Sequence, residues 1–531
     1  MMDYQLTLPT LLERARRWFP EQQIVSNLPE GIHRYTFRDF YGRVCRLMNV
    51  LRGLGVRPGD RVATFAWNHF RHMELYYAVP ALGAVLHTLN IRLAPQQLEY
   101  IVNNAEDTTI FADADLAPQL VPLLGRIPSV QSFVIMGAAD PAATGLAPVL
   151  DYETLMADAA EDAEFPEIGE REACMLCYTS GTTGNPKGVL YSHRSQVLQC
   201  LIGGMTDNFQ FTEGDVMLAI APMFHVNGWG IPFLCAMLGA RPVLPGATLD
   251  SATLVRLIRE EGVTFTNGVP TIWTGVLDYL REHGGDLGRL ERVLIGGAPV
   301  PLELIDAYRR DYGVALRQAW GMTETAPPGR PLVYTRSMQA LPEAEKLAFL
   351  RKSATVGPCE EIKVVDELGV ELPWDDTAMG ELLVRGVGMA AGYFNNPEAS
   401  QAFADGWLHT GDVVSVDPHG NYRIRDRAKD LIKSGGEWIS SVALENAIMS
   451  CAGVAEAAVV ARPDHRWDER PVAFVVLRGD AAPTEPEDII AHIAPEFAKW
   501  QLPGPEDIRF VEALPKTSVG KFDKKVLRTQ V

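Results

Sequence analysis

Apolar and polar positions follow two alternating patterns along the chain up to residue 319. Short apolar runs, which predict strands, alternate with stretches whose apolar residues recur every three or four positions, which predict amphipathic helices. The predicted helices span residues 36–54, 69–82, 98–104, 116–127, 251–261 and 301–312, and the predicted strands span residues 61–66, 109–112, 132–136, 172–178, 292–295 and 314–319. This alternation predicts an α/β fold of mostly parallel sheets flanked by helices, with ligands at the carboxyl ends of the strands.

The charge pattern changes near residue 427. From there on, acidic and basic residues nearly balance, so almost all of the net charge of −19 lies in the first 426 residues. We therefore expect a large N-terminal domain over residues 1–426 and a small C-terminal domain over residues 427–531. The last stretch, residues 516–528, is basic, and a basic tail is usually a solvated surface. Removing the charge of Lys524 or Lys525 is expected to leave activity near that of the wild type.

The composition excludes several classes of protein. With 47% hydrophobic and 22% charged residues, the chain lies in the range of ordinary globular proteins. Its acidic charge disfavours binding of nucleic acid or of an anionic membrane by bulk charge. The seven cysteines are odd in number and widely scattered, which disfavours a disulfide framework and favours a reducing compartment. A cytoplasmic location is expected.

Two local features have competing interpretations. Cys174 and Cys177 have the spacing of a redox or metal-binding pair, but residues three apart on a strand point to opposite faces, so we expect core packing instead. The most apolar stretch, residues 216–240, is interrupted by Pro222 and Pro232 and is not expected to span a membrane. The N-terminus lacks the apolar segment of a signal peptide.

The strongest local signal is the string YTSGTTGNPKG at residues 178–188. Glycines let backbone N–H groups turn toward an anion, hydroxyls add donors and Lys187 supplies a positive charge, which together suit a polyphosphate. The string is not a Walker A loop, because Pro186 replaces the second glycine and Gly188 stands where a magnesium-binding Ser or Thr is required. On composition alone, a Gly- and Thr-rich loop without function is the alternative.

Two further strings follow predicted strands, where an α/β sheet opens its crevice. In WGMTETAP, residues 320–327, the Thr-Glu pair can ligate Mg²⁺ and contact phosphate, and Trp320 offers a flat face for a base. In IGGAP, residues 295–299, the small residues allow a ring to lie against the backbone. Taken singly, each string is explained more simply as an ordinary turn between a strand and a loop.

A third pair of strings, GWLHTGD at residues 406–412 and RDRAKDLIKSGGEW at residues 425–438, lies next to the expected domain boundary. A carboxylate and a guanidinium brought together from these strings could bind the two hydroxyls of a ribose. Structural salt bridges are the alternative.

Taken together, these strings resemble those of the adenylate-forming superfamily, which includes acyl- and aryl-CoA synthetases, beetle luciferases and the adenylation domains of peptide synthetases. The resemblance rests on residues 178–188, 222–228, 296–299, 320–327, 406–412, 425–438 and 515–521, which occur in the family's order and span nearly the whole chain. Within the superfamily, the chain is most similar to bacterial medium-chain fatty acyl-CoA ligases and to methylmercaptopropionate-CoA ligases. The resemblance implies a large N-terminal domain and a small, mobile α+β C-terminal domain.

The resemblance implies an AMP-forming acid-thiol ligase that uses ATP and Mg²⁺. Such an enzyme activates a short- or medium-chain carboxylic acid as an acyl-adenylate and transfers the acyl group to coenzyme A. His225 supports this assignment, because amino-acid-activating domains carry an Asp at the matching position. The alternatives are an aryl- or cinnamoyl-CoA ligase, a stand-alone adenylation enzyme that passes its acyl group to a carrier protein, and a nucleotide-binding regulator without catalysis. No carrier domain follows Lys521 in the sequence.

The resemblance also implies roles for individual residues. The catalytic residues would be Lys521, Thr179, Glu324 and His225, with Glu324 as the metal ligand and Lys429 as the hinge. ATP or AMP would be bound by Thr179, Ser180, Gly181, Thr182, Thr183, Gly184, Lys187, Gly297, Ala298, Pro299, Trp320, Gly321, Met322, Thr323, Glu324, Asp412 and Arg427. The CoA loop would comprise Lys433, Ser434, Gly435, Gly436, Glu437 and Trp438, and the acyl pocket would be lined by His225, Val226, Trp229, Phe233 and Gly296.

The expected partners are small molecules, namely the carboxylic acid, ATP and CoA. No nucleic acid and no integral membrane segment is expected, and a homodimer is expected by analogy. A bulky residue in place of Gly436 should spare adenylation and impair thioester formation, because the family places this glycine against the pantetheine arm.

Overall fold

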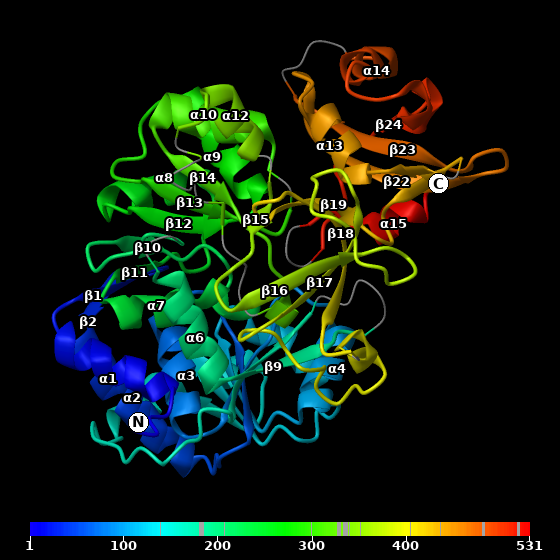
Figure 1. The fold of residues 1–531 in the computed structure, drawn as a ribbon. Coiled ribbons are helices and arrows are strands. Elements are labelled where there is room, and N and C mark those ends of the chain that lie inside the picture. The colour runs from blue at the N-terminus through cyan, green and yellow to red at the C-terminus, as the bar shows by residue number, and fades with distance from the viewer. Residues whose placement is uncertain are drawn as a thin grey trace.

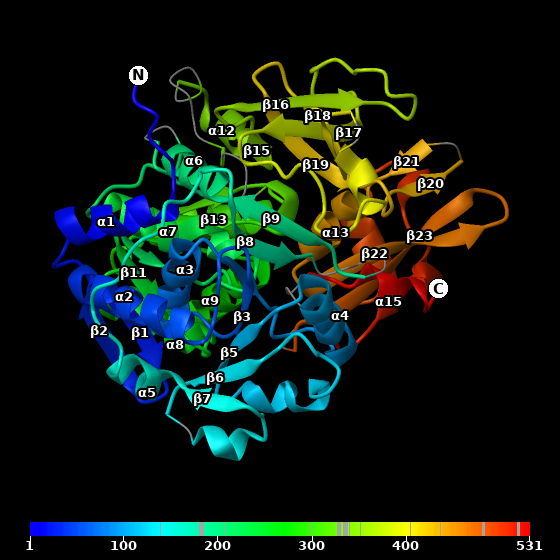
Figure 2. The same cartoon turned by 90° about the horizontal axis from the view of Figure 1, so that it is seen from below.

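The computed structural model describes residues 1–138, 140–179, 185–205, 208–298, 300–325, 331–332, 338, 340–350, 352–403, 405–435, 437–479, 484–517 and 521–531. In these residues the strands form four sheets, and helices cover them (Figure 1). The C-terminal unit, coloured orange to red, lies at one end of the molecule beside β18 and β19, and the view in Figure 2 shows the same arrangement from below.

Two seven-stranded sheets form the larger part of the fold, with the orders β7-β6-β5-β3-β4-β8-β9 and β14-β13-β12-β10-β11-β1-β2. Neighbouring strands are parallel, except that β8 pairs antiparallel with β9 and β1 with β2. The first sheet comprises β3 (Arg61–Phe65), β4 (Val85–Thr88), β5 (Thr109–Asp113), β6 (Ser132–Met136), β7 (Val149–Asp151), β8 (Ala173–Tyr178) and β9 (Gly188–Ser192). The second comprises β1 (Gln23–Leu28), β2 (Gly31–Thr36), β10 (Val216–Leu218), β11 (Arg241–Leu244), β12 (Phe265–Gly268), β13 (Arg292–Ile295) and β14 (Ala315–Gln318).

Two smaller sheets follow in the chain. The third is antiparallel and comprises β15 (Ala354–Thr355), β16 (Glu360–Val365), β17 (Gly380–Gly386), β18 (Leu408–Val416) and β19 (Asn421–Arg427). The fourth comprises β20 (Ile432–Ser434), β21 (Glu437–Ile439), β22 (Val454–Asp464), β23 (Asp468–Leu477) and β24 (Ile508–Phe510). The chain therefore passes from one sheet to the next between Arg427 and Ile432, which contains the predicted hinge.

Helices separate and cover the two large sheets. One core cluster contains side chains of both sheets together with those of α1–α3, α6 and α7, so these helices form the layer between the sheets. A second cluster packs α8, α9 and α10 on the other face of the second sheet, and a third packs α4 on the first sheet. The helices are α1 (Leu8–Trp18), α2 (Phe37–Gly53), α3 (Phe70–Ala81), α4 (Pro95–Ala105), α5 (Tyr152–Ala157), α6 (His193–Gly203), α7 (Ile231–Leu238), α8 (Ser251–Glu260), α9 (Pro270–His283), α10 (Leu302–Tyr312), α12 (Glu343–Phe349), α13 (Ser441–Met449), α14 (Pro486–Ile493) and α15 (Lys524–Arg528).

The predicted α/β fold is confirmed, and α2 illustrates why the local pattern is informative. Thr36 caps the helix by accepting a hydrogen bond from the backbone N–H of Asp39, whose carboxylate in turn accepts one from the N–H of Thr36. Phe37, Phe40 and Val44 are fully buried and follow the helical spacing, so one face of α2 packs against the core.

Two expectations are wrong. Residues 116–127 form two short 3₁₀ turns, Ala117–Gln119 and Val121–Leu123, because Pro118 and Pro122 lack the backbone N–H that a continuous α-helix requires. Cys174 and Cys177 belong to the same hydrophobic cluster rather than to opposite faces, since the register of β8 shifts between Ala173 and Met175. Both thiols are buried and free, as expected for core packing.

Among the described residues, no helix has the length and apolar character needed to cross a membrane. Residues 216–240 are the most apolar stretch of the sequence. Within it, β10 and α7 are both too short to cross a membrane.

Candidate functional site

Of the predicted catalytic residues, Lys521 of the C-terminal unit lies close enough to Glu324 and His225 for their charges to interact. Burial lowers the pKa of Lys521 to about 8, the guanidinium of Arg427 adds to this shift, and the carboxylates of Asp412 and Glu324 oppose it. Burial likewise lowers the pKa of His225 to about 3, and the charge of Lys521 contributes to that shift. We call Lys521, His225, Glu324, Asp412 and Arg427 the candidate site.

Lys521 is carried by a loop that is fixed at both of its ends. Thr517 donates its backbone N–H to the carbonyl oxygen of Lys521 at 2.7 Å, and the N–H of Lys521 reaches the Thr517 hydroxyl at 3.2 Å. The side chain of Lys521 points toward Gly297, where an added Cβ would lie 3.4 Å from Cε of the lysine. Gly297 lies two residues after β13 ends at Ile295, so this lysine reaches the carboxyl end of a strand of the second sheet.

The predicted ribose pair is present as an ion pair. Asp412 on β18 lies opposite Arg427 on β19, and its Oδ1 is 2.7 Å from Nε of the arginine. Its Oδ2 accepts a hydrogen bond of 2.8 Å from the indole N–H of Trp320. The buried carboxylate contacts Arg427 through one oxygen and Trp320 through the other. It therefore connects the third sheet to the loop after β14.

The predicted phosphate loop is closed at its base by two hydrogen bonds. Thr179 donates its backbone N–H to the carbonyl oxygen of Lys187 at 2.9 Å, and the N–H of Lys187 donates to the Thr179 hydroxyl at 3.2 Å. Among the residues predicted for the site, Ser180, Gly181, Thr182, Thr183, Gly184, Pro299 and Gly436 lie outside the described residues. Thr179 directly follows β8 and Lys187 directly precedes β9, so both lie at the carboxyl end of β8.

Tyr393, which the sequence did not identify, connects Lys187 to Glu324. The phenol donates a hydrogen bond of 2.5 Å to Oε1 of Glu324, and the ammonium of Lys187 lies 5.0 Å from the centre of the ring. Burial and the adjacent Glu324 raise the pKa of Tyr393, so the hydroxyl stays protonated and acts as the donor. The backbone N–H of Ala390 also donates to the carbonyl oxygen of Glu324 at 2.8 Å.

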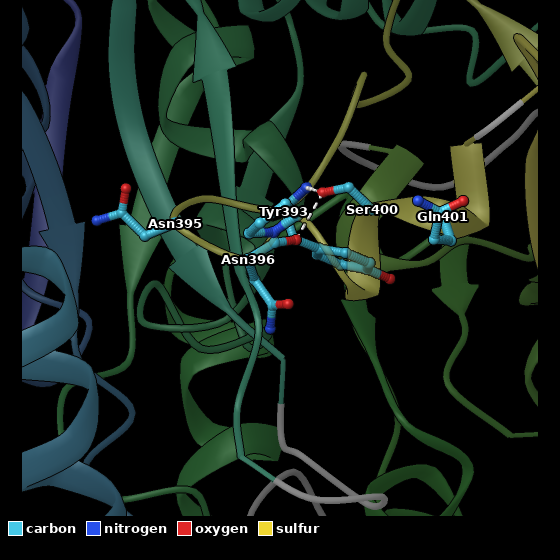
Figure 3. Close-up of a pocket in the computed structure, with 6 residues that line it drawn as sticks. Tyr393, Asn395, Asn396, Ser400 and Gln401 are labelled. Atoms are coloured by element: carbon cyan, nitrogen blue, oxygen red, sulfur yellow. Dashed lines mark hydrogen bonds between the residues drawn. The ribbon is translucent and has the colours of Figure 1, made fainter.

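An open pocket adjoins this tyrosine (Figure 3). Its lining residues are Tyr393, Asn395, Asn396, Pro397, Ser400 and Gln401. The Ser400 hydroxyl donates to the carbonyl oxygen of Asn396 at 2.8 Å and accepts the backbone N–H of Tyr393 at 2.9 Å, which fixes the loop that holds the tyrosine.

The loop around Thr323 is held by α6 and β9. The buried Tyr191 hydroxyl donates to the carbonyl oxygen of Thr323 at 2.5 Å, and the hydroxyl of Thr325 accepts the N–H of Met322 at 3.0 Å. Thr323 and Glu324 are buried, whereas the neighbouring Gly321 is only partly buried. Ala298, which follows Gly297, is exposed.

The predicted acyl-pocket residues follow an unusual backbone. Val226, Asn227 and Trp229 have positive φ values of 45°, 53° and 57°, a conformation that costs free energy in residues other than glycine and is common at functional sites. The thiol of Cys177 reaches the side-chain oxygen of Asn227 at 3.0 Å, which helps to hold this turn. A Cβ on Gly296 would lie 3.1 Å from Cη2 of Trp229, so the indole occupies the space above that glycine.

Phe233 lies deeper than the other predicted acyl-pocket residues. It is fully buried on α7, and its ring packs at 5.5 Å and 5.4 Å from the rings of Tyr76 and Tyr77 on α3. In the described structure these contacts make it a core residue of the layer between the two large sheets.

The predicted CoA loop lies in the fourth sheet, apart from the candidate site. Lys433, Ser434, Glu437 and Trp438 form the β20–β21 hairpin. The N–H of Gly435 donates to the carbonyl oxygen of Trp467 at 2.8 Å, and the ammonium of Lys433 lies 5.8 Å from the ring of Trp438. These contacts are all within the C-terminal unit, so this arrangement brings Lys521 to the candidate site but leaves the hairpin outside it.

Lys524 is not a charge of a solvated tail, and that expectation is wrong. Its side chain is 12% exposed, and Nζ lies 2.7 Å from both Oε1 of Glu445 and the hydroxyl of Ser441. Lys525, the next residue, is exposed. Lys429, the predicted hinge residue, is exposed and accepts a hydrogen bond of 3.1 Å from Arg528 through its carbonyl oxygen.

Comparison with known proteins gives consistent matches over nearly the whole chain. The model of the AMP-binding enzymes matches residues 12–394, and the model of the C-terminal domain of AMP-binding enzymes matches residues 443–521. A long-chain-fatty-acid–CoA ligase of Thermus thermophilus is 46% identical, over 100% of this chain and 96% of its own. A 3-methylmercaptopropionyl-CoA ligase of Ruegeria lacuscaerulensis is 41% identical, over 100% of this chain and 98% of its own.

A medium-chain-fatty-acid–CoA ligase of Ectopseudomonas oleovorans is 40% identical, over 99% of this chain and 96% of its own. Among solved structures, the anthranilate CoA ligase AuaEII in complex with anthranoyl-AMP superimposes with a TM-score of 0.88 at 26% identity, covering 100% of this chain and 98% of that one.

Proposed function

We propose a function for this chain, which belongs to the family of AMP-binding enzymes. It is an AMP-forming acid-thiol ligase that activates a carboxylic acid with ATP and transfers the acyl group to CoA. The observation that carries this proposal is the position of Lys521. This lysine comes from the end of the C-terminal unit and reaches His225 and Glu324 on loops of the N-terminal part, beside Asp412 and Arg427 on β18 and β19.

The first half-reaction requires positive charge in a site from which water is largely excluded. A carboxylate oxygen attacks the α-phosphate of ATP, and negative charge builds up on the phosphate oxygens as pyrophosphate leaves. Lys521 would stabilise the charge at the carboxylate and α-phosphate, and Lys187 the charge of the leaving phosphates. Asp412 and Arg427 would orient the ribose, with the indole of Trp320 and the backbone of Gly297 beside the adenine.

The residues present also fit a magnesium ion. Mg²⁺ in nucleotide sites usually has one or two carboxylate ligands and completes its shell with phosphate oxygens and waters. Glu324 supplies one carboxylate. Tyr393 donates to its Oε1, and the side-chain hydrogen bonds of the described residues include none to Oε2, which would serve as the ligand. When bound, the ion would neutralise charge on the phosphates of ATP.

The second half-reaction would use the other face of the C-terminal unit. CoA attacks the carbonyl carbon of the acyl-adenylate as a thiolate, and AMP leaves. The predicted CoA hairpin, Lys433–Trp438, lies away from the candidate site while Lys521 occupies it. We infer that the C-terminal unit, residues 427–531, turns about Lys429 between the two steps.

A single assay tests the proposed function. ATP-dependent release of pyrophosphate and AMP, coupled to loss of the CoA thiol in the presence of fatty acids, is the expected result. Pyrophosphate exchange without CoA consumption would contradict it in favour of a carrier-protein partner, and the absence of both would contradict any ligase.

Trp229 is expected to limit the length of the acyl chain. Its indole fills the space above Gly296, so Trp229→Ala should open this space and shift the ratio of kcat/KM for laurate over butyrate upward by about tenfold. A panel of acids from propionate to laurate, with cinnamate and methylmercaptopropionate, measures the shift. Gly296→Ala is the matched control, because its methyl group would press on the same indole and favour short acids. An unchanged ranking in Trp229→Ala would show that Trp229 lies away from the substrate.

The rate of adenylation should fall as the pH rises through about 8. Lys521 must be a cation to stabilise the transition state, and a lysine with a pKa of about 8 carries its charge only below that pH. Thioester formation from supplied acyl-adenylate should rise over the same range, since it depends on ionisation of the CoA thiol. In Lys521→Arg, whose side chain stays charged, the fall in any remaining adenylation above pH 8 should disappear. Persistence of that fall would assign it to another group.

We infer a cytoplasmic location from the seven free cysteines, and a homodimer by analogy. Size-exclusion chromatography with light scattering tests the oligomeric state, and a monomer would contradict that inference.

A further inference from the structure

Asp426 is a buried carboxylate that connects the parts of the chain before and after the hinge. It lies on β19, three residues before Lys429, and is 1% exposed. Its Oδ2 accepts hydrogen bonds of 2.6 Å from both the backbone N–H and the hydroxyl of Ser441, the first residue of α13. Oδ1 accepts the N–H of Arg427 at 2.8 Å.

The contact continues to the loop that carries Lys521. Lys524 donates from Nζ to the same Ser441 hydroxyl at 2.7 Å and pairs with Glu445 on α13. Burial raises the pKa of Asp426, and the charge of Lys524 opposes that shift, so the two charges act on each other. Lys524 begins α15, three residues after Lys521. A continuous path of polar contacts therefore runs from β19, through Ser441, to the end of the catalytic loop.

We propose that Asp426 is a positioning residue for adenylation, which holds the C-terminal unit in the arrangement that places Lys521 in the candidate site. This inference rests on the proposed function. Of the side chains that form the path, Asp426 precedes the hinge, whereas Ser441, Glu445 and Lys524 follow it. A turn about Lys429 separates Asp426 from Ser441 and Lys524 and leaves buried charges without their partners, which is unfavourable.

Asp426 therefore affects the two half-reactions differently. It stabilises the arrangement needed for adenylation, and it must be released before the CoA hairpin can approach. A second hydrogen bond connects the parts of the chain before and after the hinge, since the Ser440 hydroxyl donates to the carbonyl oxygen of Arg425. Loss of the Asp426 charge should for this reason weaken the arrangement without abolishing it.

The test is Asp426→Asn, which keeps the size of the side chain and removes its charge. Single-turnover formation of acyl-adenylate should slow by about tenfold, the value expected for loss of a charge-assisted buried contact. Conversion of supplied acyl-adenylate and CoA to thioester should be unchanged or faster. Trypsin should also cleave faster after the exposed Lys429 in the absence of substrates, which reports on the arrangement without any reaction.

Asp417→Asn is the matched control. Asp417 is a buried carboxylate at the β18–β19 turn of the same sheet, where it accepts hydrogen bonds from Asn421. This control should lower the melting temperature without changing the ratio of the two half-reactions or the cleavage at Lys429. If Asp426→Asn does not fold, Ser441→Ala removes the bridging hydroxyl alone and should give a smaller change of the same sign.

Two results would overturn the inference. An unchanged ratio of half-reaction rates in a folded Asp426→Asn or Ser441→Ala protein would show that Asp426 does not position Lys521. Equal slowing of both half-reactions, which also leaves their ratio unchanged, would show a merely structural role. Failure of the wild-type protein to form acyl-adenylate would instead refute the proposed function, and the trypsin comparison would then still decide whether Asp426 holds the arrangement.

Discussion

Lys521→Ala should slow acyl-adenylate formation by roughly two to three powers of ten. The lysine is the cation that the C-terminal unit brings to the candidate site, where it lies beside Gly297 and within the field of Asp412 and Glu324. Because we propose that Lys521 acts only in the adenylating arrangement, the variant should still convert supplied acyl-adenylate and CoA to thioester at a nearly normal rate. Separate single-turnover assays of the two half-reactions measure the effect.

Lys525→Ala is the control for this experiment. Lys525 belongs to the same basic stretch but is exposed, so both half-reactions should remain within about twofold of the wild type. Lys524→Ala is not a suitable control, because it removes a buried ion pair with Glu445. Should Lys521→Ala form adenylate normally, or fail equally with supplied adenylate, Lys521 does not have the proposed role.

Asp412→Ala should raise the KM for ATP by about one to two powers of ten. The carboxylate is expected to accept hydrogen bonds from the ribose, and it also orients Arg427 and the indole of Trp320. Its removal leaves both donors without their acceptor next to the nucleotide. Pyrophosphate release measured at varied ATP gives the KM, and the KM for CoA should change little.

The control for Asp412 is a carboxylate of the same sheet that is remote from the nucleotide. Asp417→Ala removes a buried acceptor of Asn421 and should lower the melting temperature while leaving the KM for ATP unchanged. An ordinary KM for ATP in Asp412→Ala would reduce Asp412 to a structural partner of Arg427.

Much of the fold could be predicted because its signals are local. The strands at residues 132–136 and 292–295 lie where the apolar runs predicted them, since a strand buried on both faces has few polar positions. The prediction of a helix at residues 116–127 was wrong. The apolar spacing is helical there, but two prolines lack the backbone N–H groups that a continuous α-helix needs for its hydrogen bonds. The antiparallel third sheet has weaker local signals, and no pattern in the sequence specified its pairing.

The candidate site was predicted to the extent that its motifs follow strands whose carboxyl ends meet. Tyr393 was missed because its hydrogen bond joins residues 69 positions apart, and nothing around a tyrosine in a loop identifies its partner. Lys524 was misjudged for a similar reason. Lys524 and Lys525 are adjacent and chemically identical, and only the packing of α15 against α13 buries the first and exposes the second.

The ring of Tyr393 affects which charges are available to a nucleotide at the candidate site. An ion pair between a lysine and a glutamate would neutralise both charges, and an incoming nucleotide would then have to break it. Here the ammonium of Lys187 lies over the ring of Tyr393, and the Tyr393 hydroxyl donates a hydrogen bond to the carboxylate of Glu324. The ion pairs of the described residues accordingly include none between these two. Tyr393 thus separates the charges of Lys187 and Glu324, which leaves the lysine available to a phosphate and the glutamate available to the cation that accompanies it.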